Sequence, residues 1–162
     1  MKCCGSWLLL PKLSFSSIMF YKLTQANTYI ERNFHMKLNH DCIRDILLFV
    51  EENVNYNQYA DFSAVELKNY SRDEIIYSAD KLLEAGFIDG NKISSLGATL
   101  PSIRITSITW TGHQFLDNIR DESIWKSTKS VLSHFSSVSL SMVGNVASQV
   151  LSAFISKHLG ML

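Results

Sequence analysis

The stretch Ser71 to Asn91 reads SRDEIIYSADKLLEAGFIDGN, and it decides the fold. Apolar residues recur in it at the three- and four-residue spacing that places side chains on one face of a helix. Ser71 is a favourable N-cap, and Glu74 follows three residues later in the position of a capping box. Gly86 comes after the last apolar pair, where a left-handed residue commonly ends a helix. The stretch predicts one helix with a defined start and stop, whose inward residues are Ile75, Ile76, Ala79, Leu82 and Leu83.

The residues after this helix predict a small β-hairpin. Residues 87–88 begin a strand that meets the turn signal Asp89-Gly90-Asn91. A long loop, residues 91–102, leads to a return strand at residues 103–110, which is rich in β-branched side chains. A helix that ends in this way and runs into a hairpin is typical of the third helix and wing of a winged helix-turn-helix domain.

Amphipathic segments on either side complete the predicted core. Asn39 is expected to cap an early helix, and residues 62–67 predict a short second helix or turn that leads into the main helix. Thr111 is expected to cap a helix after the hairpin, and a further helix runs to about Phe135. We therefore expect a mainly α fold with a small β-hairpin (α+β), a winged helix-turn-helix core plus C-terminal helices. The inward stripe of the early helix is Ile43, Ile46, Leu47 and Val50.

Charge divides the chain into three parts. Residues 1–35 carry about three net positive charges, residues 36–125 have eight basic and fourteen acidic side chains, and residues 126–162 have three basic and no acidic ones. We expect an N-terminal leader or extension, a winged-helix domain and a C-terminal amphipathic helical tail, respectively. An acidic central domain counts against a strong general affinity for nucleic acid.

The N-terminal part resembles the beginning of a signal peptide, but Pro11 and Lys12 interrupt its apolar run early. Because Met36 is itself a candidate translation start, we interpret residues 1–35 as a leader or an upstream extension of the reading frame. The alternative is an N-terminal arm that packs on the domain.

The three cysteines, Cys3, Cys4 and Cys42, form no framework of spaced pairs. Cys42 lies beside the apolar face of the early helix and is expected to be a buried free thiol. Cysteines without spaced pairs favour a reducing, cytoplasmic location. The sequence predicts no metal site and no cofactor.

The last segment carries no Asp, Glu, Lys or Arg between Lys129 and Lys157. Its apolar residues follow the 3-4-3-4 spacing of a coiled-coil seam. The segment is expected either to self-associate, which makes the protein a homo-oligomer, or to pack back on its own domain. Its many Ser, Asn and Gln residues argue against membrane insertion. The seam residues are Leu140, Val143, Ala147, Val150 and Phe154.

The block Ile108 to Lys129, ITWTGHQFLDNIRDESIWKSTK, resembles a phage- and prophage-associated family catalogued as domain of unknown function 2513. The resemblance extends from about Met36 through KLLEAGFI and covers about three quarters of the chain. It implies a winged-helix-like fold and carries no assigned activity. One departure is Ser78, where relatives usually have a histidine. The matching motif positions are Thr109, Trp110, Gly112, His113, Phe115, Leu116, Asp117, Arg120, Asp121 and Trp125.

Within this block, His113, Asp117 and Arg120 invite a catalytic interpretation because they lie within two turns of one predicted helix. No nucleophile, metal-ligand set or second carboxylate with a basic partner converges on them. We therefore expect a structural link that fixes this helix against the wing. Trp110 and Trp125 are expected to be core aromatics.

DNA binding is the usual role of a winged helix. On the main helix, however, Arg72 and Lys81 are outnumbered by four carboxylates. We expect a non-enzymatic module that binds a host or phage protein, with a dimeric, sequence-specific DNA-binding regulator as the alternative and a membrane-active tail less favoured. The candidate nucleic-acid contacts are Lys68, Arg72, Tyr77, Lys81, Lys92 and Arg104.

Overall fold

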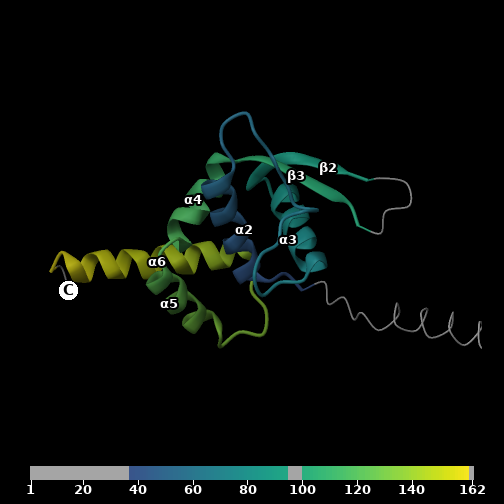
Figure 1. Cartoon of the computed structure of the whole chain (residues 1–162). Helices are drawn as coiled ribbons and strands as arrows, with labels where there is room; N and C mark the ends of the chain where they lie inside the picture. The colour runs from purple at the N-terminus through teal and green to yellow at the C-terminus, as the bar shows by residue number, and fades with distance from the viewer. Residues whose placement is uncertain (1–36, 95–99, 161–162) are drawn as a thin grey trace, which may run out of the picture. The chain divides into compact units, whose positions relative to one another are not determined.

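Five helices and a three-stranded antiparallel sheet make up the α+β fold of the described chain, which in this computed structural model comprises residues 37–94 and 100–160. Figure 1 shows the sheet beside the helices, with the long C-terminal helix α6 below α4. The expectation of a leader falls on residues 1–35, outside the described part.

The first described helix, α2 (His40–Asn53), begins where the sequence predicts. The Asn39 side chain accepts hydrogen bonds from the backbone N–H groups of Asp41 and Cys42, at 2.9 and 3.3 Å. Cys42 is a buried free thiol, as predicted, and burial raises its pKa to about 11. Such a thiol is protonated at neutral pH and is a poor nucleophile. The predicted inward stripe of α2 is buried: Ile43, Ile46, Leu47 and Val50.

The main helix, α3 (Arg72–Glu84), has both predicted ends. The Ser71 hydroxyl accepts a hydrogen bond from the Glu74 N–H, and Gly86 has a φ of 71°. The capping box is incomplete, because the Glu74 carboxylate accepts instead from the Asn39 side chain at 2.7 Å. This hydrogen bond joins the capping residues of α2 and α3, which are far apart in the sequence.

No helix forms at residues 62–67, so the alternative prediction of a turn is the correct one. The Asp61 carboxylate accepts from the Ser63 N–H at 2.9 Å and holds the chain in a turn. Phe62 is fully buried, and its N–H donates to the Ile103 carbonyl. The predicted three-helix core is therefore wrong at its second helix.

The sheet differs from the predicted hairpin in two ways. A third strand, β1 (Ala60–Asp61), pairs with β3 (Ser102–Ile108), which also pairs with β2 (Ile88–Ile93). Residues 89–91, predicted as a turn, lie inside β2 at a bulge. A Cβ on Gly90 would lie 2.1 Å from the Arg104 carbonyl oxygen, so this glycine permits close strand approach instead of a turn.

Helix α4 (Trp110–Ile119) is capped by Thr109, two residues before the predicted cap. The Thr109 hydroxyl accepts from the Gly112 N–H and donates to the Gly86 carbonyl, at 3.1 and 2.7 Å. This cap places Trp110 in the first turn with 77% of its surface exposed, so its prediction as a core residue is wrong. Trp125 is 2% exposed, as predicted.

The last two helices are α5 (Glu122–Leu132), capped by Asp121, and α6 (Leu140–His158), capped by Ser139. The first half of α6 packs against α4 and α5. Its second half runs away from the other helices toward the C-terminus (Figure 1). No helix within the described residues is sufficiently long and apolar to cross a membrane.

Candidate functional site

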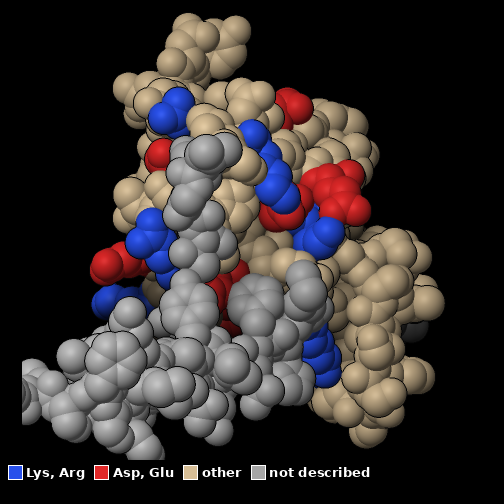
Figure 2. Space-filling view, turned by 90° about the vertical axis from the view of Figure 1, so that its right-hand side faces the viewer, with Lys and Arg blue, Asp and Glu red and all other residues tan. Residues whose placement is uncertain are grey.

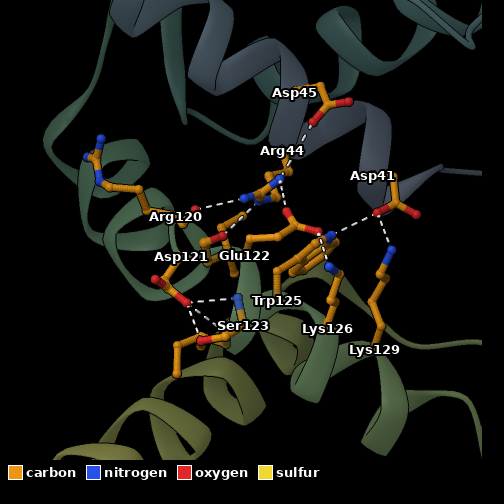
Figure 3. Close-up of polar contacts among 12 residues, drawn as sticks. Asp41, Arg44, Asp45, Arg120, Asp121, Glu122, Ser123, Trp125, Lys126 and Lys129 are labelled. Carbon is orange, nitrogen blue, oxygen red and sulfur yellow. Dashed lines mark hydrogen bonds and ion pairs between the residues drawn. The ribbon is translucent and has the colours of Figure 1, made fainter.

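Arg44 is the centre of a charged cluster where α2 meets α4 and α5 (Figure 3). Its Nε donates to the Ile119 carbonyl at 2.8 Å, and one terminal nitrogen donates to the Arg120 carbonyl at 2.7 Å. Its other terminal nitrogen lies 3.2 Å from a Glu122 carboxylate oxygen. The guanidinium thus satisfies carbonyls at the C-terminal end of α4, where a positive charge also complements the helix dipole.

Asp41 extends this cluster on the same face of α2. Its Oδ1 accepts from the Trp125 indole N–H at 2.7 Å and from the Lys129 ammonium at 2.8 Å. Burial opposes ionisation of Asp41, but the hydrogen bonds from Lys129 and Trp125 outweigh it and lower its pKa. The only polar group of the buried Trp125 side chain is therefore paired with α2.

The charged motif residues His113 and Arg120 contact Glu51 on α2, whereas the sequence predicts that they fix this helix against the wing. Arg120 pairs with both Glu51 and Asp117, and the His113 Nδ1 lies 3.8 Å from a Glu51 oxygen. Hydrogen bonding to Arg120 lowers the pKa of Glu51, with burial opposing it. The wing is not the partner because the face of α4 that carries these residues lies against the last turns of α2.

The structural role predicted for these motif residues extends to their apolar neighbours. Phe115 and Leu116 are buried, and the Phe115 ring lies 5.2 Å from that of Phe87. A Cβ on Gly112 would lie 2.0 Å from the Phe87 carbonyl oxygen, so the helix touches the backbone before β2. The motif therefore locks α4 onto the hairpin through its first turn and onto α2 through its charged face.

The candidate nucleic-acid residues are largely paired with carboxylates. Lys92 binds Asp80 at 2.7 Å, Lys81 binds Glu84, and Arg104 lies 3.5 Å from Asp61. Two of these residues also contact aromatic rings, since Lys81 lies 5.8 Å from the Tyr77 ring and Arg104 lies 5.1 Å from the Tyr59 ring. Figure 2 shows lysine and arginine interspersed with acidic side chains on the visible part of one face.

Lys68 and Arg72 make no ion pair with another described residue. Arg72 lines a pocket of about 380 Å³ at the start of α3, together with residues 63–67, Tyr70 and Ile75. The pocket lies over the turn that replaces the predicted second helix. It is remote in sequence from the motif block, and none of the motif residues lines it.

The five seam residues of α6 separate into two groups. Val143 and Ala147 are fully buried, and Leu140 is partly buried against the core. Val150 is half-buried, and Phe154 is 44% exposed. Beyond them, Ile155 and Leu159 are 51% and 67% exposed. The seam is thus covered by its own domain at one end and uncovered at the other.

Several of these features were not identified from the sequence. Arg44 stands between two buried residues, Ile43 and Ile46, and this position on an apolar stripe was the one available signal. Asp41 and Glu51 carried no comparable signal, because their partners come from helices more than 60 residues away. Ser78 is buried, and its hydroxyl has no hydrogen-bond partner among the described residues. No cluster of metal-ligating side chains occurs in the part of the chain that the structure describes.

Comparisons with known proteins agree with the resemblance drawn from the motif block. A family model described as Hypothetical protein (DUF2513) matches residues 37–139. An uncharacterized protein of Haemophilus influenzae (strain ATCC 51907 / DSM 11121 / KW20 / Rd) is 30% identical over 121 residues, which are 74% of this chain and 99% of the relative. No solved structure matches the chain. The matched region runs from the start of the described residues to the residue that caps α6, and the chain belongs to the DUF2513 family.

Proposed function

We propose that this chain is a non-enzymatic, phage- or prophage-type winged-helix module that binds a protein partner in a regulatory role and self-associates through α6. The observation that carries the proposal is the uncovered C-terminal half of α6. There Phe154, Ile155 and Leu159 are each between 44% and 67% exposed. Exposed apolar residues grouped on one helix commonly mark a surface that binds another protein.

The winged-helix assignment is supported by the order of elements. A helix, a short strand, a turn, the main helix and a two-stranded wing follow one another, and the short strand pairs with the second strand of the wing. The turn at residues 62–67 occupies the sequence position of the usual second helix.

A protein partner is favoured over DNA by the state of the candidate DNA-contacting cations on α3, β2 and β3. Lys81, Lys92 and Arg104 each lie beside a carboxylate, so phosphate contacts would have to displace existing ion pairs. Phosphate contacts supply most of the affinity of DNA-binding proteins. Among the described residues, Lys68 and Arg72 are candidate DNA contacts that make no ion pair, so few cations are ready to bind phosphate.

The non-enzymatic assignment rests on the motif residues that most invite a catalytic interpretation. His113 and Arg120 lie beside Glu51, and Arg120 also pairs with Asp117, at the surface between α2 and α4. Their ion pairs explain their spacing without a substrate. Replacing His113 with Ala is expected to leave partner binding intact, and loss of a measurable turnover would contradict the assignment.

Light scattering of the full chain over a range of concentrations tests self-association. We expect a dimer or larger assembly, and we expect Phe154→Ser to shift it toward monomer. Ser152→Ala, on the polar side of the same half-helix, is the matched control and should leave the mass unchanged. A chain that is monomeric at every concentration would remove the self-association from the proposal.

The alternative, a dimeric DNA-binding regulator, is favoured only by Arg72 at the start of α3. Retention on a column of mixed genomic DNA separates the two functions. The partner-binding module is expected to pass through at low salt, whereas a DNA binder would be retained and would elute as salt rises. Retention that Arg72→Ala abolishes and Lys126→Ala preserves would favour the regulator.

A further inference from the structure

Building on the proposed self-association, we propose that the partner of the uncovered half of α6 is the same half-helix of a second copy, packed antiparallel to it. The surface consists of Val150, Leu151, Phe154 and His158 on α6. The antiparallel orientation follows from two observations: which face of α6 is exposed in its second half, and that α4 and α5 cover the same face in its first half.

The uncovered surface continues a buried face. Val143, Ala147, Val150 and Phe154 succeed one another at spacings of four, three and four residues, so their side chains lie on one side of the helix. Val143 and Ala147 are fully buried, where α6 packs against α4 and α5. The same side is open at Phe154, which is 44% exposed. One continuous stripe is thus half covered.

A second copy of the half-helix can pack on the open part of this stripe because neither surface carries charged side chains along the seam. No Asp or Glu follows Glu122 in the chain, and no Lys or Arg lies between Lys129 and Lys157. Two such helices therefore meet without like charges along the seam, and Ser148, Ser152 and Ser156 remain at the solvent side. Phe154 and His158 stack at 4.8 Å between ring centroids and already form one continuous surface.

A parallel pair is excluded by the position of the domain. In a parallel pair, the N-terminal halves of the two α6 helices would also lie side by side through the same face. That face carries α4 and α5 of each copy. Helices in contact have axes about 8–10 Å apart, which leaves no room for one intervening helix layer and still less for two.

An antiparallel pair avoids this conflict. With Val150 of one copy opposite Phe154 of the other, the open halves face each other and the two domains lie at opposite ends. The C-terminal end of each helix then lies where the stripe of the other helix becomes covered by its own domain. Helix α6 is short enough for this, because it ends at His158 and is followed by Gly160 with a left-handed φ of 66°.

Disulfide trapping in the full chain tests this arrangement, in a background of Cys3→Ser and Cys4→Ser with the buried Cys42 retained. Leu151 lies on one flank of the stripe, and a register with Val150 opposite Phe154 brings the Leu151 positions of the two copies opposite each other across the interface. The Leu151→Cys chain is expected to form a linked dimer. Gln149→Cys is the control, because Gln149 points away from the seam.

His158→Cys reports the opposite orientation. In a parallel pair the two substituted positions would be adjacent, whereas in the antiparallel pair they lie about 18 Å apart along the helix axes. A disulfide needs Cα atoms within about 7 Å. We expect no linked dimer from this variant, and its formation would overturn the antiparallel arrangement.

Light scattering of the same samples separates this inference from the proposed function. A dimer that is linked by neither cysteine design would overturn the α6 pairing and leave self-association in place. A monomer in the unsubstituted chain would overturn both. A linked Leu151→Cys dimer without a linked His158→Cys dimer supports the pairing.

Discussion

Two regions of the molecule differ in which side chains they bury. One is the junction of α2 with α4 and α5, and the other is the second half of α6. At the junction, charged groups such as Arg44 and Asp41 are partly or fully withdrawn from water and each has several partners. On α6, apolar side chains such as Phe154 are exposed, and no carboxylate is present. The junction is complete within one chain, whereas the half-helix has a surface that only another molecule can cover.

The largest expected effect concerns Arg44. Arg44→Ala leaves the Ile119 and Arg120 carbonyls without their donor and removes one of the two ion-pair partners of Glu122, so we expect a loss of about 2–4 kcal/mol in the free energy of unfolding. Urea denaturation followed by circular dichroism measures it. Lys126→Ala removes an exposed ion pair with the same Glu122 and should cost less than about 0.5 kcal/mol. Equal losses would show that the junction does not depend on buried pairing.

Two valines on α6, Val143 and Val150, test whether the domain covers only the first half of this helix. Val143→Ala deletes fully buried methyl groups and should cost about 2 kcal/mol of unfolding free energy, measured at a concentration where the chain is monomeric. Val150 is only partly buried, and alanine favours the helix, so Val150→Ala should cost the monomer less than Val143→Ala does, about 0.5–1 kcal/mol. Val150→Ala should instead weaken self-association in light scattering. A large loss of monomer stability from it would mean that the domain covers this half too.

Two glycines in helices extend the test to close packing. Gly112→Ala places a Cβ only 2.0 Å from the Phe87 carbonyl oxygen, so the backbone must move, and we expect a net loss of about 1–2 kcal/mol after the gain in helix propensity. Gly144→Ala meets the Phe115 ring at 3.2 Å, a side chain that can shift slightly. We expect Gly144→Ala to be neutral or stabilising by up to about 1 kcal/mol. Thermal unfolding of both variants checks the difference in sign.

The sequence predicts best what is local in the chain. Asn39, Ser71 and Gly86 act at the helix ends where their types and neighbours indicate, because a cap is formed within three or four residues. The apolar spacing of α2 and α3 likewise identified their buried faces. These features require no knowledge of distant partners.

The features that were missed depend on distant partners. Strand β1 is two residues long and exists because Ala60 pairs with Ile105. Thr109 displaces Thr111 as the cap because its hydroxyl also binds the Gly86 carbonyl, and this choice exposes Trp110. Glu51 was no candidate because its partner Arg120 lies 69 residues away. Long-range hydrogen bonds thus decided where the local signals were ambiguous.

The smallest expected effect is a pH dependence that acts on the domain and spares the tail. Hydrogen bonds from Ser63 and Ser102, together with Arg104, hold the pKa of Asp61 at about 2 although burial opposes ionisation. Its unfolded pKa is about 3.9, so the folded state binds the proton more weakly. The stabilisation is therefore complete above about pH 4 and is lost as pH falls toward 2.

After allowance for solvent screening, we expect Asp61 to contribute about 1 kcal/mol above pH 4. The difference in unfolding free energy between the unsubstituted chain and Asp61→Asn should shrink as pH falls from 4 to 2. A constant difference would mean that the carboxylate acts through shape alone. Because no carboxylate side chain follows Glu122, the same pH change should leave the surface of α6 chemically unaltered. Acid thus weakens the polar contacts around β1 and leaves the apolar seam of α6 without a side chain to titrate in that range.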